Sequence, residues 1–186
     1  MRKPKVILVT DGDSAAQKAA EIGASNIGGR CISLSAGNPT LLTGEEIVEQ
    51  IKKTAHDPVV VMVDDRGAKG KGKGEKAMEV IINHPDVDVL GVVAVSSNGK
   101  ECKGFNVSCS VTKDGQIVEG AVDKYGNDTH GDEICGDTLS ILRGKKDLLI
   151  IGLGDPGKMD YNDEIRKGAP ITTKALKEVL NRSGKE

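Results

Sequence analysis

Three short apolar segments of this chain end in acidic residues. Each segment is rich in Val, Ile and Leu and is not interrupted by polar positions. Short continuous runs of this kind are typical of strands buried on both faces, as in a parallel sheet covered by helices. Because the carboxyl ends of parallel strands meet at one edge of the sheet, the acids that follow should lie in one neighbourhood. The segments and their acids are residues 6–9 before Asp11 and Asp13, residues 59–63 before Asp64 and Asp65, and residues 148–151 before Asp155.

The first half of the chain alternates between predicted strands and predicted helices. Asp13 is placed to cap the helix after the first strand, since a carboxylate there accepts hydrogen bonds from the free amides of the first turn. Thr43 and Glu46 have the spacing of a capping box. Strict alternation is the pattern of right-handed βαβ units. The predicted strands are residues 5–10, 31–35, 59–63 and 87–95, and the helices between them begin after residues 13, 43 and 74.

The second half breaks this rhythm. Apolar and polar positions alternate over residues 105–111, and an Asp-Gly pair precedes a further short run at 117–118, which predicts a hairpin. We therefore expect one domain, residues 1–186, with a three-layer, Rossmann-like α/β fold whose mostly parallel sheet carries a β-hairpin at one edge. The other predicted elements are a helix from about residue 132 to 142, a strand at 147–151, and a last helix that starts at Pro170.

Composition narrows the function classes. The chain has 26 Lys and Arg against 28 Asp and Glu, so its formal net charge of −2 gives no general attraction to nucleic acid or to an anionic membrane. It has no Trp, two Tyr and one Phe, which argues against base-stacking surfaces. No stretch reaches the roughly 18 apolar residues of a membrane span. We therefore expect no nucleic-acid partner and no transmembrane span.

The four cysteines show no CxxC spacing, and no secretory signal precedes them. This usage predicts an intracellular chain with reduced thiols. One zinc set can be drawn from the sequence, although its spacing and order match no known module, and ordinary buried thiols are the alternative. Its members would be Cys102, Cys109, His130 and Cys135.

Two glycine-rich stretches match nucleotide-binding loops incompletely. Residues 152–157 read G-x-G-x-x-G after a strand, but Pro156 and a long loop stand where the fingerprint requires a helix to begin. Residues 67–73 read G-x-x-x-x-G-K, but Gly74 stands where a Ser or Thr would hold magnesium. The lysines of this second stretch leave two alternatives, a mobile solvated loop and an anion clamp before a helix.

The spacing of Asp11 and Asp13 after a buried strand is the strongest catalytic signal. Haloacid-dehalogenase-like phosphohydrolases place a nucleophilic Asp and an acid–base Asp two residues apart at this point, with a Ser or Thr after a later strand and then a Gly-Asp pair. The chain resembles that order through Ser96 and Asp155, with Asp160 a few residues on. Carboxylates from two strands could hold Mg²⁺ while one of them attacks phosphorus.

That catalytic pattern is incomplete. No Gly-Thr pair follows Asp13, and no motif places a Lys. A topoisomerase-primase-type metal site is a second analogy, but its Glu is missing from the first strand. The structural alternative is that Asp and Gly are common where strands turn into helices, in which case Asp13 only caps a helix.

Long irregular segments of the chain carry a family resemblance. In order along the chain, they look like the stage V sporulation protein AE family, which includes soluble SpoVAE proteins. The resemblance covers nearly the whole chain and includes loops that a chance alternation of strands and helices would not reproduce. The matching phrases are residues 5–13 (KVILVTDGD), 29–35 (GRCISLS), 37–39 (GNP), 63–65 (VDD), 90–95 (LGVVAV), 136–138 (GDT), 152–155 (GLGD), 157–159 (GKM) and 168–172 (GAPIT).

The resemblance implies a soluble product of the sporulation operon in an endospore-forming bacterium. Its membrane partners, the SpoVA system, would move dipicolinic acid into the developing spore and out of it during germination. The expected location is the interior of the developing spore, in solution or peripheral at the spore inner membrane. The resemblance assigns no catalytic residue, and none is carried over.

Two hypotheses follow. The first is a non-enzymatic accessory subunit that docks on SpoVA membrane proteins and binds a small anionic ligand or a cation at the strand ends, with no obligatory cofactor. The second is a Mg²⁺-dependent phosphohydrolase that uses Asp11 and Asp13. We favour the first, because the catalytic pattern lacks its Lys and its Gly-Thr pair. The candidate ligand-binding residues are Asp11, Asp13, Asp64, Asp65, Ser96, Asp155 and Lys158.

Overall fold

The computed structural model describes residues 2–68, 70–97, 104–136 and 138–184. Its main sheet has seven strands in the order β2-β3-β1-β4-β9-β6-β7. All neighbours in this sheet are parallel except β6 and β7, which form an antiparallel pair at one edge, as predicted. The strands are β1 (Lys5–Val9), β2 (Arg30–Cys31), β3 (Val59–Met62), β4 (Asp88–Val95), β6 (Cys109–Val111), β7 (Ile117–Val118) and β9 (Ile150–Leu153).

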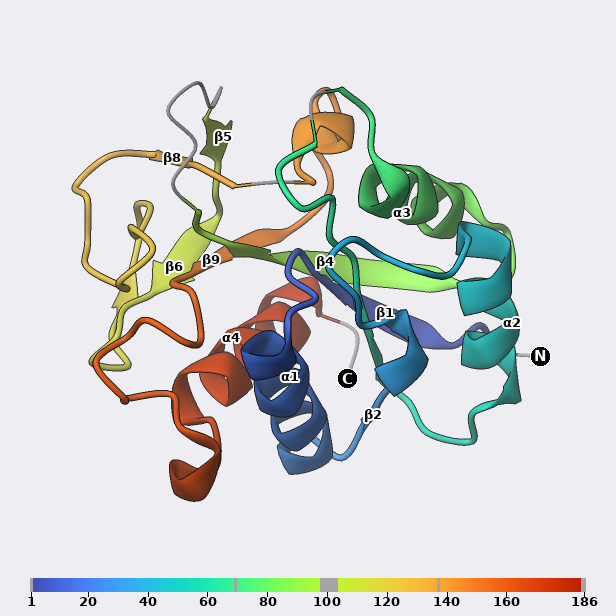
Figure 1. Ribbon diagram of the computed structural model, residues 1–186, viewed down its shortest axis with the longest axis horizontal. Coiled ribbons are helices and arrows are strands. Elements are labelled where there is room, and N and C mark those ends of the chain that lie inside the picture. The colour runs from blue at the N-terminus through green and yellow to red at the C-terminus, as the bar shows by residue number, and fades with distance from the viewer. Residues whose placement is uncertain (1, 69, 98–103, 137, 185–186) are drawn as a thin grey trace.

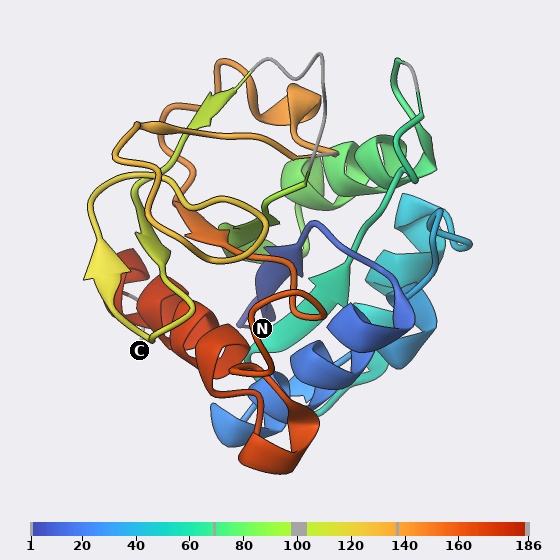
Figure 2. The ribbon, with the colours of Figure 1, turned by 60° about the vertical axis from the view of Figure 1, so that its left-hand side comes forward.

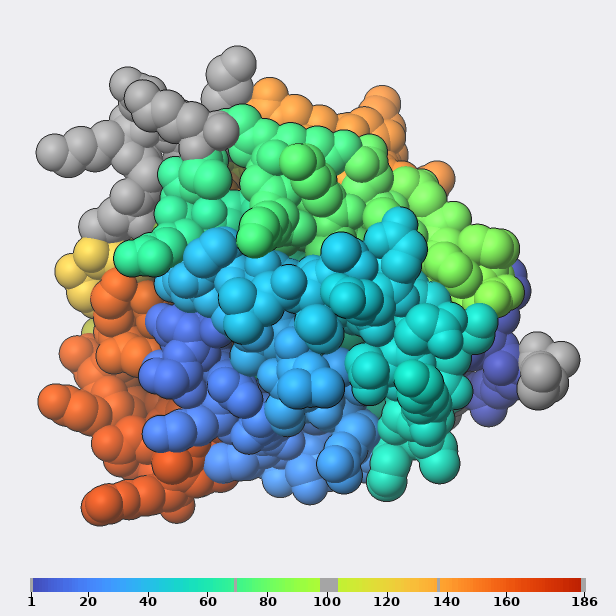
Figure 3. All heavy atoms as spheres, turned by 45° about the vertical axis from the view of Figure 1, so that its right-hand side comes forward, coloured from blue at the N-terminus to red at the C-terminus, as the bar shows by residue number. Residues whose placement is uncertain are grey.

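Helices cover both faces of this sheet (Figure 1). The helices α1 (Ser14–Asn26) and α4 (Pro170–Ser183) lie side by side on one face (Figures 1 and 2). The helices α2 (Gly44–Lys53) and α3 (Lys73–Asn83) cover the other face, and their side chains form the cyan and green parts of the surface in Figure 3. This arrangement confirms the expected three-layer, Rossmann-like α/β fold.

Strand β1 shows why the apolar runs are continuous. Its side chains alternate between two separate cores, with Val6 and Leu8 packed under α2 and α3. Ile7 and Val9 point the other way, into the core under α1 and α4. Both faces of the strand are buried, so no polar position interrupts the run.

The predicted helix caps are present. Asp13 Oδ1 accepts hydrogen bonds from the amides of Ala15 and Ala16, both at 2.9 Å, at the start of α1. Thr43 and Glu46 form the capping box of α2. In α1, a Cβ on Gly23 would lie 2.9 Å from Leu176 Cδ1, so a glycine at this position allows α1 to approach α4 closely.

The predicted second strand at 31–35 is mostly wrong. Only Arg30–Cys31 pairs with β3, and the chain then turns into the 3₁₀ helix η1 (Ser33–Ser35). The buried Ser35 hydroxyl donates to the Ile32 carbonyl at 2.6 Å and accepts from the Met62 amide at 2.9 Å. A polar group that satisfies backbone atoms of two segments replaces the expected pairing of strands.

The predicted strand at 105–111 is split in two. Its first part, β5 (Phe105–Asn106), pairs with β8 (Glu133–Ile134) in a separate two-stranded sheet. Its second part, β6, joins β9 and forms the expected hairpin with β7. The switch occurs at Ser108, whose amide donates to the Ile150 carbonyl at 2.7 Å.

The helix predicted at 132–142 is also wrong. This stretch contains β8 and the short 3₁₀ helix η2 (Ser140–Leu142). Thr138 has a left-handed φ of 65°, a conformation that ends any α-helix. A third 3₁₀ helix, η3 (Ile165–Lys167), precedes α4.

The cysteine expectations need correction. Cys135 is in a disulfide, so the prediction that all thiols are reduced is wrong for this residue. Cys31 and Cys109 are free and buried, as ordinary packing predicts. The zinc set loses one ligand to the disulfide, and its member Cys102 lies outside the described residues.

Strand order places a switch point beside β1. The strands β2 and β3 lie on one side of β1, whereas β4, β9 and β6 lie on the other. Ligand sites of open α/β sheets lie outside the carboxyl ends of the strands at such a point. In this chain the switch point lies between β1 and β4.

Candidate functional site

The loops after β1 and β9 bring three carboxylates together. Asp11, Asp13 and Asp155 each offer one ligand atom, and these atoms all lie within 4.8 Å of one another. The three side chains are half-buried. We call Asp11, Asp13 and Asp155 the acidic cluster.

The acidic cluster spans the end of the intervening strand β4. Ser96 follows β4 at this point and is buried. Its amide donates to the Leu153 carbonyl of β9 at 2.8 Å. Ser96 therefore ties the two strand ends together by its backbone.

Gly12 fixes the spacing between the two acids of the first loop. A Cβ at Gly12 would lie only 2.2 Å from the Gly37 carbonyl oxygen, so any larger residue would push the loop away. The Gly12 carbonyl accepts from the Gly37 amide at 2.9 Å, and the Gly12 amide donates to Asp64 Oδ2 at 3.2 Å. These contacts hold Asp11 and Asp13 in place.

Asp13 has two roles in the structure. Its Oδ1 atom caps α1, and its amide donates to Asp11 Oδ1 at 3.2 Å. The sequence analysis offered capping as the alternative to chemistry, and the structure shows that the cap and the clustering coexist.

Asp155 is held by its own loop. Its amide donates to the Lys124 carbonyl at 2.8 Å, and its Oδ1 accepts from the Gly157 amide at 3.0 Å. Its Oδ2 lies 3.0 Å from the ammonium of Lys158. The hydrogen bond and the charge of Asp155 raise the pKa of Lys158, so this lysine is a cation beside the cluster.

The acidic cluster is electrostatically unfavourable, because it holds a partly buried carboxylate close to other carboxylates. Burial raises the pKa of Asp11 to about 7, and the negative charges of Asp13, Asp155 and Asp64 act in the same direction. The hydrogen bond from the Asp13 amide opposes this shift without cancelling it. At neutral pH the Asp11 carboxyl is therefore close to half protonated.

The donor set suits a hard cation. Three carboxylates are the ligands that Mg²⁺ and Ca²⁺ prefer, whereas zinc and copper sites use His and Cys. A divalent cation would offset the repulsion that raises the pKa of Asp11. Three carboxylates are fewer ligands than either ion takes, so the remaining positions would go to water or to a bound anion.

Asp64 and Asp65 are at the same edge but outside the cluster. Asp64 Oδ1 accepts from the Arg66 amide at 2.8 Å. Asp65 Oδ1 accepts from the amides of Gly74 and Glu75, at 2.7 and 3.2 Å, at the start of α3. The expected single neighbourhood of five acids is therefore divided into an acidic cluster and two acids that bind backbone amides.

The glycine-rich stretches fit no nucleotide. Asp65 already occupies the first amides of α3, which an anion clamp would need. Lys71 pairs with Glu79. After the stretch 152–157 no α-helix begins until Pro170. Asp160, a member of the phosphohydrolase pattern, pairs with Lys113 at 2.7 Å and is not in the cluster.

Sequence analysis missed two buried acids. Asp163 Oδ1 accepts from the amides of Ile171 and Thr172, at 2.8 and 2.9 Å, and its Oδ2 accepts from the Thr172 hydroxyl at 2.5 Å. Glu75 is buried, and its Oε1 accepts from the Ser140 amide at 2.7 Å. No spacing rule finds either residue, because Asp163 lies eight positions before the amide it binds and Glu75 binds a segment 65 positions away.

Comparison with models of protein families identifies the family of this chain. The model described as Stage V sporulation protein AE1 (SpoVAE) matches residues 5–183 of the 186-residue chain. The chain belongs to the SpoVAE family. No curated protein and no solved structure shows significant similarity to it. The resemblance predicted from the sequence phrases is confirmed.

Membership of the SpoVAE family connects the chain with sporulation and with the developing spore. The matched range includes the acidic cluster and all of its supporting loops. Over the described ranges, no helix combines the length and the hydropathy that crossing a membrane requires.

Proposed function

We propose that this SpoVAE-family chain is a non-enzymatic accessory component of the SpoVA system that binds a divalent cation at its acidic cluster. Its partners are the SpoVA membrane proteins, which move dipicolinic acid into the developing spore and out of it during germination. It acts inside the developing spore, peripheral to the inner membrane. The observation that carries the cation site is the approach of Asp11, Asp13 and Asp155 within 4.8 Å.

Physical chemistry supports a cation rather than a purely structural cluster. Each of these carboxylates would be better solvated apart from the others, and the pKa of Asp11 is raised first by burial and then by the charges of the neighbouring carboxylates. The Lys158 ammonium pairs directly with Asp155, on one side of the cluster, and interacts more weakly with Asp13. A divalent cation offsets the remaining charge, and its open coordination positions offer a place for a small anionic ligand. Asp64 and Ser96 hold this site in place. Asp64 accepts a hydrogen bond from the Gly12 amide, and the Ser96 amide donates to the end of β9.

The non-enzymatic proposal is supported by the position of Asp13. In the phosphohydrolase pattern this residue would be the acid–base group, which must exchange a proton with the leaving group. In this chain one of its oxygens accepts from two amides of α1. A helix cap accounts for this residue without catalysis.

One observation favours a second candidate, a Mg²⁺-dependent phosphohydrolase. The phosphohydrolase pattern needs a Lys that no motif supplied, and the structure places Lys158 3.0 Å from Asp155. In such a reaction an Asp11 oxygen would bond to phosphorus as the bond to the leaving alkoxide breaks, and Asp13 would give that alkoxide its proton. Water would then hydrolyse the aspartyl phosphate.

Thermal unfolding with and without cations tests the cation site. Protein treated with EDTA is melted with Mg²⁺ or Ca²⁺ added back, alongside the variants Asp11→Asn and Asp155→Asn. We expect a cation-dependent rise in Tm for the wild type and none for either variant. The matched control is Asp114→Asn, an exposed turn residue, which should respond like the wild type. Equal responses in all four proteins would remove the cation site.

Phosphatase assays separate the two candidate functions. Hydrolysis of p-nitrophenyl phosphate is measured with Mg²⁺ for the wild type and for Asp11→Asn. The accessory proposal predicts no turnover above that of the variant. Turnover that disappears with Asp11→Asn would establish the phosphohydrolase instead.

The proposed partnership is tested separately. In sporulating cells, the tagged chain should fractionate with membranes that contain the SpoVA proteins and should be released when those proteins are deleted. Spores of the Asp11→Asn strain should contain less dipicolinic acid than wild-type spores. Membrane association that is unchanged by the deletion would contradict the SpoVA partnership, whether or not the chain binds a cation.

A further inference from the structure

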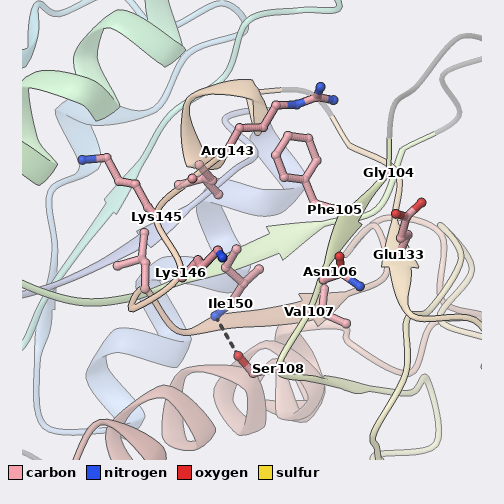
Figure 4. A pocket seen from close by; sticks show the side chains of 13 residues that line it. Gly104, Phe105, Asn106, Val107, Ser108, Glu133, Arg143, Lys145, Lys146 and Ile150 are labelled. Atoms are coloured by element: carbon pink, nitrogen blue, oxygen red, sulfur yellow. Dashed lines mark hydrogen bonds between the residues drawn. The ribbon is translucent and has the colours of Figure 1, made fainter.

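A pocket far along β9 from the acidic cluster has a different chemistry. It has a volume of about 690 Å³ and lies between residues 104–108, which include β5, and residues 142–150, which lead into β9 (Figure 4). Ile150, at the start of β9, lines it, whereas Asp155 follows the opposite end of that strand. Volumes of this size are typical of small-molecule sites.

The pocket has an apolar base. Leu142 and Ile150 are buried in it, and the half-buried Phe105 and Leu148 complete its walls. Phe105 is the only Phe of the chain, and its ring is part of this lining. Polar side chains line the rest of the pocket, and its apolar base favours a ligand that has an apolar body.

The edge of the pocket is positively charged. The Arg143 guanidinium lies over the Phe105 ring, 5.1 Å from its centroid, and Lys146 lines the pocket beside Ile150 (Figure 4). Within the described part of the chain, neither of these cations is in an ion pair. Lys145 differs, because its ammonium donates to Asn83 Oδ1 at 3.0 Å and points away from the pocket. Among the described residues of the lining, Glu133 is the one acid, and it lies across the pocket from Lys146 (Figure 4).

We propose that this pocket binds a small organic anion with a flat apolar body, whose carboxylate or phosphate lies against Arg143 and Lys146. The apolar body would lie on Phe105 and Ile150. The anionic group points away from Glu133, which gives the ligand one orientation. Arg side chains bind carboxylate and phosphate in a bidentate manner, so both groups suit this edge. The proposal does not depend on the acidic cluster.

Titrations followed by ¹⁵N–¹H correlation spectra test this pocket. The probes are benzoate and phenyl phosphate, with benzamide as the neutral analogue of benzoate and inorganic phosphate as the anion without an apolar body. We expect both aromatic anions to shift the amides of residues 104–108 and 142–150. Benzamide and inorganic phosphate should bind at least about tenfold more weakly than the aromatic anions. Benzamide lacks the negative charge, and inorganic phosphate lacks the apolar body. Benzoate without phenyl phosphate, or the reverse, would identify which anion the site prefers.

Variants make the result specific. The double variant Arg143→Gln and Lys146→Gln should weaken binding about tenfold or more, and Glu133→Gln should tighten it. Lys145→Gln is the control for each single change, because it removes one positive charge that points away from the pocket, and it should change affinity less than about twofold. Asp11→Asn should leave binding unchanged.

Three outcomes would overturn the proposal. The first is equal binding of benzoate and benzamide, and the second is equal weakening by Lys145→Gln and by the double variant. The third is a set of shifts centred on the acidic cluster instead of the pocket. The double variant is uninformative if its Tm lies far below that of the wild type. In that case Glu133→Gln tests the proposal, because the loss of its negative charge should tighten binding of the anion. Unchanged or weaker binding by Glu133→Gln would contradict the proposal.

Discussion

Asp11 and Asp65 each follow a buried parallel strand at the same edge of one sheet, yet their surroundings are opposite. Asp65 faces two backbone amides of α3, at 2.7 and 3.2 Å. Asp11 faces one amide at 3.2 Å and two other carboxylates. The same residue type at equivalent places therefore stabilises a helix in one case and lies among other carboxylates in the other. The two acids differ in the number of backbone amides that the segment after each strand provides to them.

Asp163 extends the comparison, since it is a buried acid that accepts three hydrogen bonds. Replacing it by Ala should leave two amides at the start of α4 without their acceptor and remove the Thr172 hydroxyl bond. We expect the free energy of unfolding to fall by about 3 kcal/mol, measured by urea denaturation. The control Asp114→Ala should cost less than about 0.5 kcal/mol, because Asp114 is an exposed turn residue. Equal losses for both variants would contradict the capping role.

The substitution Asp11→Asn should change the free energy of unfolding in the opposite direction. At pH 8 and without divalent cations, the Asp11 carboxylate is charged and faces Asp13 and Asp155. Removing its charge should raise the free energy of unfolding by about 2 kcal/mol, a value discounted from the pKa shift for solvent screening. Urea denaturation of both proteins in EDTA measures this difference. A destabilised Asp11→Asn would mean that the cluster is not repulsive.

The pH dependence of stability sharpens the same contrast. The folded protein holds the Asp11 proton to about pH 7, whereas the unfolded chain loses it near pH 3.8. The stabilisation from this proton is complete below about pH 4 and is lost as the pH rises to about 7. The free energy of unfolding should therefore fall through this window, with a slope of up to about 1.4 kcal/mol per pH unit.

Asp11→Asn separates this effect from other acids. Burial also raises the pKa of Asp65 and of Asp163, and both act in the same direction. Their contributions remain in the Asp11→Asn variant, so the difference between the two pH curves isolates Asp11. Saturating Mg²⁺ or Ca²⁺ should flatten the wild-type curve and leave the variant unchanged. Parallel curves for both proteins would show that Asp11 has an ordinary pKa.

Lys158→Gln should give the smallest effect. The side chain is half exposed, so its pair with Asp155 should contribute less than about 1 kcal/mol to stability. The same lysine competes with a cation for Asp155, and removing it should tighten Mg²⁺ or Ca²⁺ binding by a few-fold, measured by calorimetry. Lys174→Gln, a change of the same charge on α4, should leave the affinity unchanged. Weaker cation binding in Lys158→Gln would contradict this competition.

Much of the layered fold could be predicted from the sequence. Continuous apolar runs predicted the parallel strands, and the caps at Asp13 and Thr43 predicted where helices begin. Local signals were sufficient there because the interactions themselves are local. The segment 132–142 was predicted wrongly, because its conformation depends on pairing with Phe105 and on contacts with Glu75.

The candidate site could be predicted in part for the same reason. Strand ends brought Asp11, Asp13 and Asp155 to one edge, as the topology required. The sequence did not separate them from Asp64 and Asp65, since these two acids bind amides of the Gly12 loop and of the first turn of α3, and no local pattern predicts those contacts. Nor did it place Lys158 beside Asp155.

Proton release on cation binding tests the central claim most directly. EDTA-treated protein is titrated with Ca²⁺ and with Mg²⁺ at pH 7.0 by calorimetry, in two buffers of different ionisation enthalpy. Because the pKa of Asp11 is about 7, binding at the acidic cluster should release about half a proton per ion, and Asp11→Asn should release none. Binding without proton release, or the same release from Asp11→Asn, would contradict the account.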